Sequence, residues 1–250
     1  MRIVSTIEAR MASTRLPGKT MRKILGRPML ELLIERLKRA RKVDEIVVAT
    51  TVNPEDEVII KLAERVGVKW FRGSSEDVLD RVLRAAKAHK GDVIVEMTGD
   101  CPLLDPEIVD TMVTKFLAGK GKYDYVANII KRTYPRGLDT QVFPVAVLEE
   151  VSHLTQDPAD RENVSLYIYE HPEKYRLLNV EAPPELARPD LRLTVDTEED
   201  LRLTREIYSA LFPGKPAFTT LDVIKLIDAN PALAMVNVHV QQKRIRGQPK

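Results

Sequence analysis

Short apolar runs and stretches of helical periodicity alternate along the chain, beginning at the third residue. Between Pro28 and Arg41, four apolar residues follow the i, i+3, i+4, i+7 spacing of one helix face: Leu30, Leu33, Ile34 and Leu37. The runs that predict strands are Ile3–Ile7, Glu45–Thr50, Lys69–Phe71 and Asp92–Met97. Because strand and helix alternate, we expect an α/β fold, a mainly parallel sheet with helices on its faces.

Helix starts are marked by a capping residue that is followed by proline or by acidic residues. Asn53-Pro54 and Asp105-Pro106 carry this signal, and Ser74 or Ser75 is expected to cap a helix that runs to about His89. An open parallel sheet binds ligands at the carboxyl ends of its strands. Each loop that follows a strand is therefore a candidate site.

The alternation loosens after residue 123. The predicted strands are Asp124–Ile130, Thr140–Phe143, Tyr175–Val180 and Leu191–Val195. The predicted helices are Pro158–Glu170, Thr197–Tyr208 and, as the last of the chain, Thr219–Ala229. We expect residues 123–190 to form a smaller α+β section inside a single domain of residues 1–250.

Composition and charge exclude several classes of partner. The 250 residues include 39 Lys and Arg against 37 Asp and Glu, so a net charge of +2 gives no general attraction to nucleic acid or an anionic membrane. Cys101 is the single cysteine, so neither an intramolecular disulfide nor a thiolate metal cage can form. No apolar stretch approaches the roughly 20 residues of a membrane span. We expect a cytoplasmic protein that binds neither nucleic acid nor membranes.

The loop after the first predicted strand, residues 8–19, is rich in cations. Its GKT ending matches the end of a Walker loop, but Ser13 stands where that motif needs its first glycine, and Pro17 removes a backbone donor. The G-x-G-x-x-G dinucleotide motif is absent as well. The cations that could neutralise a polyphosphate directly are Arg10, Arg15 and Lys19. A solvated cationic loop is the alternative.

Two acidic residues follow later strands. Asp100 could hold Mg²⁺ against the phosphates of a nucleotide, although a turn-forming Asp is the simpler interpretation. Asp196, with Glu199 three residues on, also resembles a helix N-terminal capping arrangement. Because a residue can cap and coordinate at once, we expect Asp100 and Asp196 to form a two-carboxylate magnesium site.

Taken together, these motifs resemble a known family. The string ARMASTRLPGK at residues 9–19 is similar to the CTP-binding loop ARxGS[ST]RLPGK of the CMP–sugar-acid synthetases. The rest of the chain resembles the SpsF-like, spore-coat-polysaccharide branch of that cytidylyltransferase superfamily. Further matches, in order between residues 3 and about 208, are FRGS at 71–74, DVLDR at 77–81, TGDCPL at 98–103, YP at 134–135, GLD at 137–139, DRE at 160–162 and RLTVDT at 192–197.

The resemblance implies a Rossmann-like nucleotidyltransferase of the nucleotide-diphospho-sugar transferase type. In such an enzyme an acceptor oxygen attacks the α-phosphorus of CTP and pyrophosphate leaves, so catalysis is positioning plus charge neutralisation. The acceptor would be a small anionic molecule, a sugar acid or related precursor for surface polysaccharide or glycoconjugate synthesis. The smaller section commonly helps to form a dimer in relatives, so a homodimer is expected.

The resemblance also assigns roles to the matched positions. The CTP-binding positions are Ala9, Arg10, Ala12, Ser13, Arg15, Lys19, Arg72, Gly73, Ser74 and Asp77, with Arg81 extending the last motif. The catalytic set is Arg10, Lys19, Asp100 and Asp196, and its two aspartates fall on the magnesium ligands. The acceptor side would be lined by Tyr134, Arg136, Asp139 and Arg161.

The chain departs from the family pattern at several positions. Glu8 replaces the usual Gln and brings a negative charge near the phosphates. Ala12 replaces a Gly and adds a Cβ where the backbone approaches phosphate. Asn163 and Ser165 replace the His and Thr that follow Asp-Arg-Glu, and Thr-Gln at 140–141 replaces Val-Glu. The last changes bear on the acceptor more than on the reaction.

Two other functions stay open at this stage. An enzyme of the same fold could transfer a sugar from a nucleotide-sugar donor, although such enzymes typically use an Asp-x-Asp metal motif that is not evident in the first half of the chain. A binding module that holds a nucleotide without turnover would be consistent with Glu8 and Ala12. Catalytic activity would exclude the second function.

Overall fold

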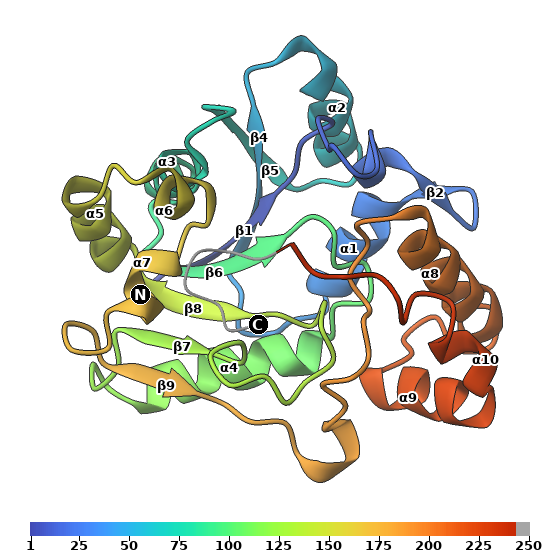
Figure 1. Cartoon of the computed structure of the whole chain (residues 1–250). Coiled ribbons are helices and arrows are strands. Elements are labelled where there is room, and N and C mark those ends of the chain that lie inside the picture. Colours follow the sequence, from blue (N-terminus) through green and yellow to red (C-terminus); the bar gives the residue numbers. More distant parts are fainter. Residues whose placement is uncertain (244–250) are drawn as a thin grey trace.

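A computed structural model describes residues 1–243 and is built around a seven-stranded sheet of order β5-β4-β1-β6-β8-β7-β9 (Figure 1). The parallel half comprises β1 (Ile3–Glu8), β4 (Glu45–Thr51), β5 (Lys69–Gly73) and β6 (Val93–Thr98). The remaining strands are β8 (Gln141–Pro144), β7 (Tyr125–Ala127) and β9 (Leu177–Asn179), and β8 runs antiparallel to both of its neighbours. Three strands of the section 123–190 thus extend the same sheet.

Helices cover both faces of this sheet. On one face lie α1 (Met29–Leu37), α2 (Glu57–Arg65), α4 (Pro106–Ala118), α8 (Glu198–Leu211) and α9 (Thr220–Ala229). On the other lie α3 (Val78–Ala88), α5 (Val145–Leu154), α6 (Pro158–Glu162) and α7 (Leu166–Glu170). Smaller elements are a hairpin of β2 (Lys23–Ile24) and β3 (Arg27–Pro28), the 3₁₀ turns Lys19–Met21, Pro54–Asp56 and Pro184–Leu186, and α10 (Pro231–Ala234).

Strand residues contribute alternately to the two cores. In β1, Ile3 and Ile7 face the α1 side, whereas Val4 packs against the α3 side. Side chains of successive strand residues point to opposite faces, so both cores can be filled from one short strand only if it is apolar on both faces. The same alternation turns Glu96 of β6, which is in register with Thr6, toward the α3 side.

Several local predictions were wrong. Asp77, not Ser74 or Ser75, caps α3, because its carboxylate accepts a hydrogen bond from the backbone N–H of Asp80. The helix expected over 158–170 is divided into two short helices, α6 and α7. The strand expected over 191–195 forms only an isolated bridge between Arg192 and Arg136. The helix expected to be the last one, α9, is followed by α10. The helix α5 was not predicted.

The strand order places the candidate loops at one edge of the sheet. The chain moves outward from β1 to β4 and β5, then returns to β6 on the other side of β1. Such a reversal opens a crevice at the carboxyl ends of the strands, and the loops after β1 and β6 border it. Within residues 1–243, no helix combines the length and apolar character needed to cross a membrane.

Candidate active site

Three charged side chains from distant parts of the chain meet at this crevice. The ammonium Nζ of Lys19 lies 2.8 Å from Oδ2 of Asp100 and 2.8 Å from Oδ1 of Asp196. A guanidinium nitrogen of Arg15 lies 3.0 Å from the same Asp196 oxygen. The structure therefore brings together four of the five residues for which the sequence predicts triphosphate and metal contacts, and Arg10 is the one outside this group.

The loop that carries Lys19 is held in place by a backbone hydrogen bond of its own and by the side chain of Asp56. The N–H of Gly18 donates to the carbonyl of Met11 at 3.0 Å, and the Met11 N–H donates to Oδ1 of Asp56 at 2.6 Å. Gly18 has φ +66°, a left-handed conformation that side chains disfavour. This turn directs Lys19, the next residue, into the site.

Asp100 is placed by the glycine before it. A Cβ at Gly99 would lie 2.6 Å from the carbonyl oxygen of Glu8, so any larger residue would push β6 and the β1 loop apart. Burial alone would raise the pKa of Asp100, but the Lys19 ammonium more than offsets burial and holds the pKa below its usual value. Lys19 in turn has a raised pKa, because its two carboxylate partners outweigh its own desolvation. Asp100 and Lys19 therefore both carry their charge at neutral pH.

Asp196 does not cap α8, contrary to the capping interpretation. Thr197 is the N-cap: its hydroxyl accepts from the N–H of Asp200, and the Asp200 carboxylate accepts from the N–H of Thr197. The Asp196 carboxylate instead contacts Lys19 through Oδ1 and the Arg192 guanidinium through Oδ2 at 2.8 Å. Because Thr197 and Asp200 satisfy the backbone N–H groups at the start of α8, the Asp196 carboxylate is not needed as a cap and can bind a ligand.

The other predicted CTP-binding residues of this loop lie at the same crevice but do not contact Asp100 or Asp196. Arg10 donates to the carbonyl of Ser75 at 3.1 Å, and the Ser13 hydroxyl accepts from the Leu16 N–H at 3.4 Å. Ala9 is buried and Ala12 is exposed. The loop is thus exposed to solvent at Ala12, where the family pattern has a glycine.

The motif at 72–81 is structural in large part. The Arg72 guanidinium donates to the carbonyls of Thr51 and Asn53, both at 2.9 Å. A Cβ at Gly73 would meet the Arg81 side chain at 2.8 Å. The hydroxyl of Ser74 accepts from the N–H groups of residues 76 and 77.

Residues expected on the acceptor side are only partly available. Tyr134 is 3% exposed and packs in the core, and Asp139 forms a two-bond ion pair with Arg132. Arg161 pairs with Asp77, which also caps α3, so this pair fastens α6 to α3. Arg136 is the exception, since its guanidinium has no hydrogen bond or ion pair within residues 1–243.

Sequence reasoning placed a negative charge at Glu8 near the phosphates, but it missed the buried Glu96 beside it, and the raised pKa of Glu8 favours the neutral carboxyl instead. Glu8 and Glu96 lie on the α3 side, where Oε1 of Glu8 and Oε2 of Glu96 have no hydrogen-bond partner in the described chain. Burial raises the pKa of Glu96 to about 7, against the hydrogen bonds from Ser165 and Gln141. Burial and then the Glu96 charge raise the pKa of Glu8 well above its usual value. A single acid inside the apolar run VIVEMT was the available signal.

The donor set fits a hard divalent cation that is shared with phosphates. No group of three or more His, Cys, Asp or Glu residues in the described chain could hold a metal by itself. Mg²⁺, however, is commonly bound by one or two carboxylates with substrate phosphates and water completing its shell. Asp100 and Asp196, already close enough to share one ammonium, supply such a pair.

The comparisons with known proteins agree with this geometry. A cytidylyltransferase family model matches residues 4–244. The chain is 40% identical to an uncharacterised protein of Methanocaldococcus jannaschii, covering 98% of both chains, and 33% identical to the spore coat polysaccharide biosynthesis protein SpsF of Bacillus subtilis, covering 93% of this chain and 96% of SpsF. It is 30% identical to the 3-deoxy-manno-octulosonate cytidylyltransferase of Geobacter metallireducens, covering 68% of this chain and 75% of that protein. A solved cytidylyltransferase structure from Leptospira borgpetersenii has a TM-score of 0.89 at 35% identity, covering 98% and 99% of the two chains.

Proposed function

Since this chain belongs to the cytidylyltransferase family, we propose that it transfers CMP from CTP to a sugar acid in a Mg²⁺-dependent reaction that releases pyrophosphate. The observation that carries this proposal is the convergence of Lys19, Asp100 and Asp196, which come from three separate segments. A cation beside two carboxylates is what binding of a metal-bound triphosphate requires, because the metal and the lysine both neutralise phosphate charge.

Each side chain has a distinct task in this proposal. Arg10, Arg15 and Lys19 bind the triphosphate, and the charge that builds up on the leaving pyrophosphate is stabilised by the same cations. Asp100 and Asp196 would hold Mg²⁺, which supplies Lewis-acid polarisation of the phosphates when bound. Lys19 must then exchange its carboxylate partners for phosphate oxygens.

The chemical class of the acceptor is inferred from two cations near Asp196, Arg136 and Arg192. Arg136 has no partner in residues 1–243, and Arg192 spans Asp196 and Asp200. A guanidinium without a carboxylate partner is suited to the carboxylate of a substrate. The acceptor class therefore agrees with that of the 3-deoxy-manno-octulosonate cytidylyltransferase, a relative that acts on a sugar acid.

The test is pyrophosphate release from each common nucleoside triphosphate with Mg²⁺ and a panel of sugar acids that includes 3-deoxy-manno-octulosonate. We expect release with CTP only, dependent on metal and on one acceptor. Asp100→Asn and Asp196→Asn should each reduce this rate by about 10² or more, with circular dichroism unchanged. Wild-type rates in both variants would reject the two-carboxylate site, and CTP binding without turnover on any acceptor would favour a binding module.

A further inference from the structure

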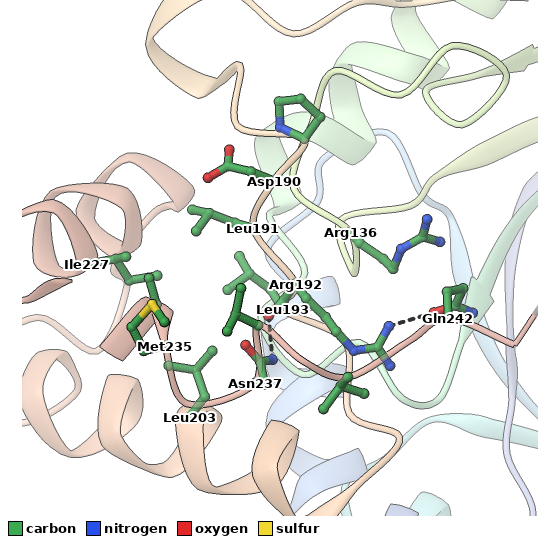
Figure 2. A pocket seen from close by; sticks show the side chains of 14 residues that line it. Arg136, Asp190, Leu191, Arg192, Leu193, Leu203, Ile227, Met235, Asn237 and Gln242 are labelled. Atoms are coloured by element: carbon green, nitrogen blue, oxygen red, sulfur yellow. Dashed lines mark hydrogen bonds between the residues drawn. The ribbon is translucent and has the colours of Figure 1, made fainter. Parts of the chain in front are cut away.

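A cavity of about 270 Å³ is lined by Arg192, which contacts Asp196 of the candidate site, and by residues of α8 and α9 (Figure 2). One wall is apolar and comes from α8, α9 and the chain after α10, with Leu203, Ile227 and Met235 among its residues. Arg136 and Arg192 line the other side, and Asp190 also lines the cavity, with its carboxylate paired to Arg188. The cavity thus offers an apolar side and, next to Arg136 and Arg192, a cationic side to one small molecule.

The two arginines are held next to each other by the backbone. The Arg136 N–H donates to the carbonyl of Leu191 at 2.9 Å, and the N–H of Leu193 donates to the carbonyl of Arg136 at 2.7 Å. Burial and then the nearby Arg132 lower the pKa of Arg136, with Arg192 acting in the same direction, and the charges of Asp139 and Asp196 offset this lowering only in part. Such crowding of cations is relieved when an anion joins them.

The last described residues run across this cationic wall. The side-chain amide of Asn237 donates to the carbonyl of Arg192 at 3.0 Å and to Oδ1 of Asp200 at 2.8 Å, which fixes the start of the segment. Five residues on, Oε1 of Gln242 accepts from Nη1 of Arg192 at 2.6 Å. Lys243 then lies 3.6 Å from Glu162 of α6. The segment 237–243 therefore connects the α8 layer with the α6 side across the site.

Arg136 is the cation without a carboxylate partner beside the ion-pair network of Asp196. In that network Arg15, Lys19 and Arg192 share the carboxylates of Asp100, Asp196 and Asp200, whereas Arg136, which lies next to Arg192, has no ion pair in residues 1–243. Nη1 of Arg192 is occupied by a neutral amide oxygen, the weakest acceptor in the group. A carboxylate on Arg136 and Arg192 would balance the charge and form stronger hydrogen bonds than the amide does.

We propose that Gln242 stands in for the carboxylate of the acceptor: its amide oxygen holds Nη1 of Arg192 until a substrate carboxylate displaces it and bridges Arg192 and Arg136. The occupant of the cavity is a small carboxylic acid whose body contacts the apolar wall under segment 237–243. Because Arg192 also contacts Asp196, the bound acid would lie one side chain from the proposed metal ligand. This inference rests on the proposed function, which makes the acid the acceptor.

The chain offers a matched pair of glutamines for the test. Gln242 contacts Arg192, whereas its neighbour Gln241 is exposed. Gln242→Glu would place a permanent carboxylate on Arg192, and Gln241→Glu adds the same charge one residue away. Gln242→Ala removes the amide without adding a competitor. Arg136→Gln removes the second cation while keeping a polar side chain.

The probe is glucuronate, and the control is neutral glucuronamide, which has an amide in place of the carboxylate. Each is titrated into the full-length protein without CTP, and binding is measured by calorimetry. We expect wild type to prefer glucuronate by about tenfold or more. Gln242→Ala should bind it at least as well as wild type. Gln242→Glu and Arg136→Gln should each lose about tenfold or more, and Gln241→Glu should match wild type.

Three outcomes would overturn the inference: equal binding of the acid and its amide, no glucuronate binding in the millimolar range, or equal losses in the two glutamate variants. Folding is checked in each variant by thermal unfolding, and CTP binding is measured separately. Failure of CTP to bind wild type would remove the proposed function while leaving the carboxylate site standing. Normal CTP binding with no difference between the two glutamate variants would remove only the role of Gln242.

Discussion

One ammonium group lies at equal distance from the two carboxylates of the site, so Lys19 is the cation that Asp100 and Asp196 share. Lys19→Met should weaken CTP binding by about tenfold or more, because a charge-assisted contact to phosphate is lost. The same variant should bind Mn²⁺ without nucleotide more tightly than wild type does, since Asp100 loses its only ion pair in residues 1–243 and Asp196 keeps only its contacts with Arg15 and Arg192. Calorimetry measures the first effect and electron paramagnetic resonance the second.

Lys23 supplies the control for this substitution. It is exposed in β2, so Lys23→Met removes the same charge from the same stretch of chain without touching either carboxylate. Unchanged CTP affinity in Lys19→Met would mean that the loop is a solvated cationic loop that does not bind the triphosphate. Equal Mn²⁺ binding by Lys19→Met and wild type would show that the ammonium does not compete with a metal.

The buried Glu96 predicts a pH dependence of stability. Its pKa is about 7 in the folded chain, against 4.5 as its ordinary value, so the folded protein keeps a proton that the unfolded chain releases. Stability should therefore fall as pH rises from about 4.5 to about 7, by about 3 kcal/mol in total, and the loss is absent below the lower value. Glu96→Gln should remove this part of the pH dependence in urea unfolding.

The exposed Glu55 is the matched control, because Glu55→Gln removes a carboxyl with no burial. The difference in unfolding free energy between Glu96→Gln and wild type should grow between pH 4.5 and 7. A difference that stays constant with pH would mean that Glu96 ionises normally in the folded protein.

Two helices begin with the same device, but only one of them borders the site. Thr197 and Thr219 each form a capping box with an aspartate three residues on, at the starts of α8 and α9. Thr197→Ala and Thr219→Ala should each cost about 1 kcal/mol in urea unfolding. Only Thr197→Ala should also lower turnover, because the residue before it is Asp196. Equal turnover in the two variants would mean that the Thr197 cap does not position Asp196 for catalysis.

The same helix start shows where sequence reasoning reached its limit. The spacing of acids after residue 195 indicates a helix N-terminus, and α8 begins there. It does not determine which of two adjacent residues caps and which faces the site, since a shift of one residue satisfies the local pattern equally. That choice depends on Arg192 and Lys19, and the contact with Lys19 joins residues 177 positions apart.

At the scale of the whole molecule, the parallel half of the sheet was predictable because each strand is followed by a helix that covers it. The section 123–190 was harder to predict: β7 and β9 have three residues each and take their partners from across the sheet. The ion pair of Arg132 with Asp139, inside that section, escaped prediction for the same reason. Glu96 escaped it because only the pairing of β6 with β1 and the packing of the α3 side bury its carboxyl next to Glu8. Motifs predict the residues of the candidate site, and tertiary contacts decide which of their side chains are free in residues 1–243.

The site joins the β1 loop, the end of β6 and the start of α8, so a ligand there must couple to global stability. CTP with Mg²⁺ at about 100 times its dissociation constant should raise the free energy of unfolding by about 2.7 kcal/mol, because the unfolded chain cannot bind it. Urea unfolding with each nucleoside triphosphate measures the effect. Selective stabilisation by CTP that disappears in Asp196→Asn would locate the nucleotide at the three-segment site. Equal stabilisation of wild type and this variant would place the nucleotide elsewhere on the protein.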